Sequence, residues 1–324
     1  MPSSLFRYEK IILLICAIIS GLGISLAIGS YAYQATGVTT QDIMFYPSDP
    51  TNYLVEDHAF QLHGRYYYPR NFDPTNQYPA LLLFHGVTRT MADVDQLART
   101  MADMGVFCFA TDFRGHGSSG GTFNFADWNT YNLTFGDAAG AYRNVSAQSY
   151  IDTSNIYSYG QSLGGGSSLF LALSDLTPQF CVWYPATAYN IGALPIYNWT
   201  SSNPDFHGYI IQGTADECGR CNPAYTQYFA DENDPNIEIY WVEGGIHGAT
   251  AETWPLYMDL TISWLVNDIG LDGEFTWWTQ TLLWSNTPIV ALAAVAAFDG
   301  IWLLLCIVKR VIISRSPLNQ TMKN

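Results

Sequence analysis

The stretch IYSYGQSLGGGSSLFLAL, residues 156–173, decides the fold of this chain. Its first four residues form a short strand candidate, and residues 165–173 form a helix candidate. Between them, the pattern Gly-x-Ser-x-Gly places Ser162 on a sharp turn that exposes its hydroxyl, while Gly160 and Gly164 let strand and helix approach closely. The pattern alone also fits a glycine-rich turn with a capping serine. A strand, a sharp turn and a helix in this order favour a serine nucleophile.

Apolar strand candidates and helix candidates alternate on both sides of this stretch. Continuous apolar strands separated by helices predict an α/β fold, with a mostly parallel sheet and helices on both faces. The predicted strands are residues 80–84, 106–110, 156–159, 180–184, 209–212 and 237–242, and the predicted helices are residues 92–104, 137–148, 165–173, 222–230 and 251–266. Residues 55–62 and 65–68 alternate around Gly64 and predict a leading antiparallel hairpin.

A serine hydroxyl needs a base near neutral pH, and the base needs a carboxylate partner. His247 follows the predicted strand 237–242 and is flanked by glycines, so we expect it to be the base. Asp216 follows the strand 209–212, and the chain order Ser162, Asp216, His247 is that of α/β-hydrolases. Glu217 is an alternative acid. A structural histidine at 247 and a helix-capping aspartate at 216 are the competing interpretations.

Acyl transfer also needs hydrogen-bond donors for the oxyanion. One predicted donor is the backbone N–H of Leu163, directly after the nucleophile. The other is expected from the loop after strand 80–84, where we choose the N–H of Val87. Both are backbone groups, so neither assignment depends on the side chain.

Together these segments resemble the α/β-hydrolase superfamily, and most closely its monoacylglycerol-lipase-like and serine-aminopeptidase-like members. The resemblance covers about residues 53–268 and implies an α/β-hydrolase fold with serine-hydrolase chemistry. It also implies that the loop containing His116 is mainly structural. Only a short insert lies between Tyr184 and Tyr209, where many relatives carry a helical cap, which argues against long-chain lipid substrates. The segments that carry the resemblance are residues 85–86, 112–120, 160–164, 213–216 and 247–248.

The two ends of the chain predict membrane anchoring. Residues 11–32 carry no charge, and a helix of that length spans the roughly 30 Å of bilayer hydrocarbon. A second apolar run covers residues 287–308, interrupted by Asp299, which we interpret as a neutral carboxyl at a helix contact or, alternatively, a functional group. Cleavage near Ala32, as for a signal peptide, is the alternative for the first run. Basic residues flank both runs on their outer sides: Arg7, Lys10, Lys309, Arg310 and Arg315.

The positive-inside rule then predicts that both termini are cytoplasmic and that the enzyme domain is extracytoplasmic in the cell membrane. The expected organisation is a cytoplasmic N-terminus (1–10), a transmembrane helix (11–32), an extracytoplasmic α/β-hydrolase domain (33–286), a second transmembrane helix (287–308) and a cytoplasmic tail (309–324). Sequons in the outside part predict glycosylation at Asn132, Asn144 and Asn198.

The outside part is strongly acidic. Residues 33–286 contain seven arginines, no lysine and 26 acidic residues, which argues against nucleic-acid binding. Cys218 and Cys221 lie just after Asp216, and an oxidising compartment favours a disulfide between them. Two free thiols, or metal or redox chemistry, are the alternatives.

We therefore expect hydrolysis of a small ester or acyl substrate through an acyl-enzyme intermediate, with no cofactor and no metal. A serine peptidase of the aminopeptidase or prolyl-oligopeptidase type is the second hypothesis, because the chemistry is the same. A non-catalytic binding protein on a hydrolase scaffold is the third, although such proteins typically lack a triad member.

Overall fold

The computed structural model describes residues 37–49, 52–174, 179–183, 208–218, 223–233, 237–247 and 254–271. Contacts within the chain divide it into two units, residues 37–273 and residues 1–36 together with 274–324. The second unit, with both expected transmembrane segments, lies outside the described residues. Among the helices that are described, none is both long enough and apolar enough to cross a bilayer.

The first unit is built on one eight-stranded sheet with the order β1-β4-β6-β5-β7-β8-β9-β10. The pairs β1–β4 and β4–β6 are antiparallel, and every other neighbouring pair is parallel. The strands are β1 (Thr40–Phe45), β4 (Leu62–Tyr67), β5 (Tyr78–Phe84), β6 (Phe107–Thr111), β7 (Ile151–Gln161), β8 (Gln179–Trp183), β9 (Gly208–Gly213) and β10 (Ile237–Val242), with β2 (Ser48–Asp49) and β3 (Asn52–Glu56) forming a small separate sheet.

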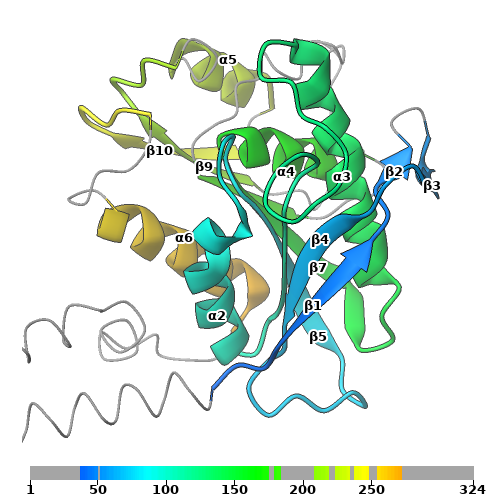
Figure 1. Cartoon of the computed structure of the whole chain (residues 1–324). Coiled ribbons are helices and arrows are strands. Elements are labelled where there is room, and N and C mark those ends of the chain that lie inside the picture. Colours follow the sequence, from blue (N-terminus) through cyan, green and yellow to red (C-terminus); the bar gives the residue numbers. More distant parts are fainter. Residues whose placement is uncertain are drawn as a thin grey trace, which may run out of the picture. The chain divides into compact units, whose positions relative to one another are not determined.

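Helices cover both faces of the large sheet, as the sequence predicts. In Figure 1, α2 and α6 lie on one face, and α3 and α4 lie on the other. The bounds are η1 (Met91–Val94), α2 (Asp95–Asp103), α3 (Trp128–Ser146), α4 (Leu163–Leu173), α5 (Pro223–Asn233) and α6 (Trp254–Ile269). The prediction of a mostly parallel, two-sided sheet is confirmed.

The predicted leading hairpin around Gly64 is wrong. Strand β4 runs straight through Gly64, which pairs with Ile43 on one side and Thr111 on the other. A Cβ at this position would lie 2.4 Å from the ring of Phe109. The glycine therefore makes room for a core aromatic ring rather than a turn. The antiparallel partner of β4 is β1, and Val55 belongs to β3 in the small sheet.

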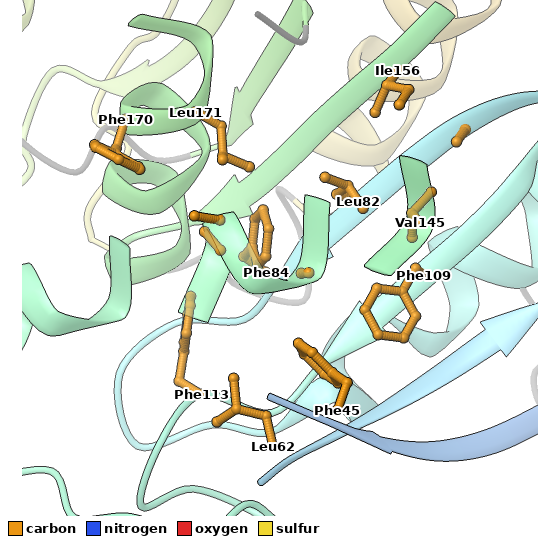
Figure 2. Packing of buried hydrophobic residues seen from close by; sticks show 14 of the residues in the cluster. Phe45, Leu62, Leu82, Phe84, Phe109, Phe113, Val145, Ile156, Phe170 and Leu171 are labelled. Carbon is orange, nitrogen blue, oxygen red and sulfur yellow. The ribbon is translucent and has the colours of Figure 1, made fainter. Parts of the chain in front are cut away.

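A large aromatic cluster fills the space between the sheet and the pair α3–α4 (Figure 2). Leu82 and Phe84 alternate along β5 into this cluster, as expected for a strand that is buried on both faces. Phe135 of α3 stacks on Phe170 of α4 with ring centroids 4.7 Å apart. This packing fixes α4, and with it the residue that precedes the helix, Ser162.

A buried ion pair holds the loop after β6 against α3. The Arg114 guanidinium donates to the Asp137 carboxylate from Nη2 at 2.7 Å and Nε at 3.0 Å, and the Arg114 backbone N–H donates to the same group at 2.9 Å. The side chains are only 6% and 0% exposed. Burial raises the pKa of Asp137, while the charge and hydrogen bonds of Arg114 oppose that rise. Removing one partner would leave an uncompensated buried charge.

Replacing Arg114 by Leu should therefore lower the free energy of unfolding by about 3–5 kcal/mol, because it strands the Asp137 carboxylate. The matched control is Arg65→Leu, since Arg65 pairs with Asp42 at the surface and such pairs contribute about 0–1 kcal/mol. Urea unfolding of the full-length chain, followed by tryptophan fluorescence, measures both. An equal loss of unfolding free energy in the two variants would contradict the larger contribution expected from the buried pair.

Candidate active site

Ser162 lies in a strained turn between β7 and α4. Its backbone has φ 49° and ψ −109°, a conformation that a non-glycine residue rarely adopts. The flanking glycines are required, because a Cβ on Gly160 would lie 2.0 Å from the Gly164 carbonyl oxygen. A Cβ on Gly164 would lie 2.3 Å from the carbonyl oxygen of Phe84. The turn thus holds Ser162 where the parallel strands β5 and β7 end.

The loops that carry Asp216 and His247 are joined by backbone contacts. They follow β9 and β10, which are parallel neighbours paired up to Gly213 and Val242. The Ala215 N–H donates to the Gly245 carbonyl oxygen at 2.9 Å, and a Cβ on Gly213 would lie 2.2 Å from that same oxygen. The two loops therefore have little freedom to separate.

The three residues predicted as a triad form one hydrogen-bonded chain. The His247 Nε2 lies 3.1 Å from the Ser162 Oγ, and the His247 Nδ1 lies 3.0 Å from the Asp216 Oδ2. With Nδ1–H donating to the carboxylate, Nε2 is free to accept the serine proton. The Asp216 side chain is fully buried, and its two oxygens also accept from the Cys218 backbone N–H at 2.9 Å and the Gln212 amide at 3.2 Å.

The alternative acid, Glu217, lies beside this chain of hydrogen bonds. Its carboxylate is 3.5 Å from the backbone nitrogen of His247, whereas the carboxylate on the ring Nδ1 is that of Asp216. Burial lowers the pKa of His247, but the hydrogen bond and charge of Asp216, with smaller contributions from Cys218 and Glu217, outweigh burial and raise that pKa overall. The environment therefore favours the protonated form of the His247 ring.

The loop after β5 lies against Ser162. A Cβ on Gly86 would lie 3.6 Å from the Ser162 Cβ. The Arg89 N–H donates to the Gly86 carbonyl oxygen at 3.2 Å, which closes a tight turn in which Thr88 has φ 63°. The described residues contain three non-glycine residues with positive φ, and two of them, Thr88 and Ser162, are in this site. Such strain marks functional segments.

His85 fixes the peptide group that contains the Val87 N–H. Its Nδ1 lies 2.7 Å from the Gly86 carbonyl oxygen, and its Nε2 accepts from the Phe113 N–H at 3.1 Å. In a trans peptide the Gly86 carbonyl and the Val87 N–H point in opposite directions. With the carbonyl held by His85, the N–H is turned away from His85. Leu163 is the first residue of α4, so its N–H has no partner within the helix.

His85 and His116 belong to the scaffold. Burial lowers the pKa of His85 to about 4, so its ring stays neutral. His116 is buried, and its Nδ1 lies 3.0 Å from the Arg114 carbonyl oxygen, as expected for the structural loop. Among the described histidines, the one hydrogen-bonded to Ser162 is His247. The positioning by His85 was not predictable from sequence, because it depends on the loop after β6 lying alongside.

The remaining predictions concern glycosylation at three asparagines and a disulfide, and each of them stays a prediction. Asn144 lies within α3, where its side-chain oxygen accepts from the Tyr66 hydroxyl, and glycosylation of its amide nitrogen stays a prediction. Asn132 is also in α3, but its side chain is not described. Asn198 and Cys221 lie outside the described residues, so glycosylation at Asn198 and the Cys218–Cys221 disulfide stay predictions.

One group in the described part of the chain has the chemistry of metal ligands. The ligand atoms of Asp216, Cys218 and His247 lie within 4.8 Å of one another. Two of these residues are the hydrogen-bonded pair of the relay, so a metal there would compete with the alignment of the base.

The sheet order, the turn at Ser162 and the order of the hydrogen-bonded residues define an α/β-hydrolase fold. The sequence model of a family described as Serine aminopeptidase, S33, matches residues 76–198. A comparison with curated protein sequences found no match.

Solved structures with the same fold include esterases and a peptidase. An esterase of Pyrococcus furiosus has a TM-score of 0.55 at 14% identity, over 73% of this chain and 95% of its own. An esterase of Thermogutta terrifontis has a TM-score of 0.54 at 16% identity, over 67% and 91%. A Bacteroides ovatus protein assigned as a dipeptidyl aminopeptidase IV has a TM-score of 0.55 at 17% identity, over 72% of this chain but only 36% of its own.

The fold and the family match over residues 76–198 together support a serine hydrolase of the α/β-hydrolase superfamily.

The two carboxylates beside His247 can be told apart by activity and its pH dependence. The base must be neutral, so kcat/KM should fall as the pH drops through the raised pKa of His247, above the usual value of about 6.5. Glu217→Gln should keep most activity and move this acid limb to lower pH, because one negative charge near the imidazolium is lost. Asp216→Asn should lower kcat by about 10⁴-fold, because the amide no longer holds the required tautomer.

Full pH profiles of both variants against wild type measure these effects. A large loss in Glu217→Gln with a mild loss in Asp216→Asn would reverse the assignment of the acid.

Proposed function

We propose that this chain hydrolyses carboxylic esters through an acyl-enzyme intermediate, with Ser162 as nucleophile, His247 as base and Asp216 as the group that orients the base. The observation that carries the proposal is the continuous hydrogen-bonded relay from the Ser162 hydroxyl to the buried Asp216 carboxylate. Proton transfer at the serine accounts for three features together: a strained serine, a histidine of raised pKa and a buried carboxylate.

In this mechanism the Ser162 Oγ attacks the ester carbonyl while the His247 Nε2 takes its proton. The oxyanion of the tetrahedral intermediate accepts hydrogen bonds from the Leu163 and Val87 backbone amides. Collapse of the intermediate expels the alcohol, which takes the proton from the imidazolium. Water, activated by His247, then attacks the acyl-enzyme and releases the acid.

The ester specificity is supported by the structural neighbours. One structure of the Thermogutta terrifontis esterase holds propionate, and another is phosphorylated by paraoxon, both at TM-score 0.52. These small groups support a small acyl substrate for this chain as well. Peptide hydrolysis is the second candidate, favoured by the description of the matching family and by the Bacteroides ovatus protein. Turnover of p-nitrophenyl esters of rising chain length, compared with aminoacyl p-nitroanilides, separates the two.

The proposal includes the placement of the enzyme at a membrane. The uncharged segment 11–32 and the apolar segment 287–308, each with basic residues on its outer side, support two spanning helices and cytoplasmic termini. The hydrolase domain would then lie outside the cell membrane. The acidity of residues 33–286 fits this arrangement, since it gives that part few charges that bind anionic lipid.

Replacing Ser162 by Ala should abolish ester turnover and covalent labelling by a fluorophosphonate probe, because the Ser162 Oγ is the atom proposed to attack both the ester and the probe. The turn already accommodates a Cβ at this position, so the thermal midpoint should not fall. His247→Ala should lose about 10⁴-fold or more in kcat, because the three residues act as a unit. Normal labelling of Ser162→Ala would sink the assignment.

Membrane placement can be checked with epitope tags. In intact cells, external protease should remove a tag inserted in the exposed loop at Asn76 and leave tags at both termini protected. Permeabilised cells are the control, in which all three tags should be cleaved. Protection of the Asn76 tag in intact cells would contradict the proposed orientation.

A further inference from the structure

The arginine beside the nucleophile differs from the other described arginines. Five of the six described arginines have side chains 6% to 38% exposed and an ion pair of 2.9 Å or less. Arg89 is 65% exposed, and its ion pair with Asp93 is 3.5 Å long. Arg89 is therefore the least committed cation among these six, in a part of the sequence where acidic residues greatly outnumber basic ones.

Its position is close to the reacting atoms. A Cβ placed on Gly86 would lie 3.6 Å from the Ser162 Cβ and 3.8 Å from the Arg89 Cγ. Gly86 therefore lies between Ser162 and the aliphatic part of the Arg89 side chain. A guanidinium on so long a stem can reach a group attached a few bonds from the scissile carbonyl.

The backbone holds Arg89 in this position. Its N–H closes the turn on the Gly86 carbonyl oxygen, which His85 also holds, and the preceding Thr88 has the strained φ of 63°. The segment that carries the proposed oxyanion donor therefore also carries this exposed cation. A flexible surface arginine would need no such restraint.

We propose that Arg89 is a specificity residue that binds a carboxylate of the substrate, so that the preferred substrates are anionic esters such as half-esters of dicarboxylic acids. The guanidinium offers paired N–H donors that match a carboxylate. The surrounding acidic surface repels an anionic substrate in general, so one cation beside Ser162 decides where such a substrate is bound. The inference rests on the proposed ester hydrolysis and names its substrate class.

The test compares esters that differ only in charge. Mono-p-nitrophenyl glutarate and p-nitrophenyl pentanoate share a five-carbon acyl group and differ in a terminal carboxylate. 4-Acetoxybenzoate and 4-methylphenyl acetate place the carboxylate on the leaving group instead. For wild type, kcat/KM should be higher for the anionic ester than for the neutral ester in at least one of these two pairs. High salt should reduce that preference.

Arg89→Gln should lower the ratio of anionic to neutral kcat/KM about tenfold in that pair, and Arg89→Lys should lose less, as expected for a charge-assisted hydrogen bond. The matched control is Arg99→Gln, which removes the same charge from a residue of α2 that is paired with Asp95 at 2.7 Å. That control should leave the ratio unchanged.

An unchanged ratio in Arg89→Gln for both pairs, or an equal fall in Arg99→Gln, overturns the inference while leaving ester hydrolysis intact. Failure of the proposed function shows differently, as ester turnover that survives Ser162→Ala. Calorimetric titration with glutarate tests Arg89 without turnover: wild type should bind glutarate more tightly than Arg89→Gln, and equal binding counts against the inference.

Discussion

The site depends on one backbone constraint, the left-handed conformation of Ser162 between β7 and α4. A non-glycine residue in this region costs about 1–3 kcal/mol, and it persists only when its surroundings fix it. Here the surroundings are the close approach of Gly160 to Gly164 and of Gly164 to the Phe84 carbonyl, both too tight for a Cβ. The aromatic packing of α4 against α3 keeps the helix in place. The turn thus exposes the Ser162 hydroxyl, and the packing around the turn prevents its backbone from relaxing.

The sheet register brings the other parts to this turn. Phe84 pairs with Gly160, so the loop that begins at His85 emerges beside Ser162. Val242 pairs with Gly213, so the base and acid loops leave neighbouring strands at the same level. Because all four strands are parallel, their carboxyl ends meet at one edge of the sheet. The proximity of Ser162, Asp216 and His247 is therefore a consequence of strand order, and their side-chain hydrogen bonds complete the arrangement.

The sequence was informative where local pattern and chemistry coincide. The positions of Ser162, Asp216 and His247 followed from apolar strands that end in glycine-rich turns, and the structure brings the three together. The hairpin at Gly64 failed because a glycine within a strand has the same local signature as a turn, and only the distant Phe109 ring distinguishes them. Strand β1 was also not predicted.

The predicted helix 137–148 began nine residues too late, since α3 starts at Trp128. The first two turns of α3 contain Asn and Thr residues with weak helix propensity. Whether a segment of weak helix propensity forms a helix depends on its tertiary contacts. In the same way, the roles of His85 and Thr88 depend on residues far away in the chain, so no local pattern announces them.

The surroundings of two histidines near Ser162 shift their pKa values in opposite directions. Burial lowers the pKa of His85 to about 4, so its ring is neutral near pH 7 and both of its nitrogens keep fixed hydrogen-bonding roles. For His247 the carboxylate of Asp216 outweighs burial and raises the pKa, so that ring can accept a proton. When the surroundings shift the pKa values of two similar groups apart, the groups are suited to different roles. His85 therefore holds the peptide that is expected to bind the oxyanion, while His247 has the raised pKa that suits the proposed base, so the two rings are not interchangeable.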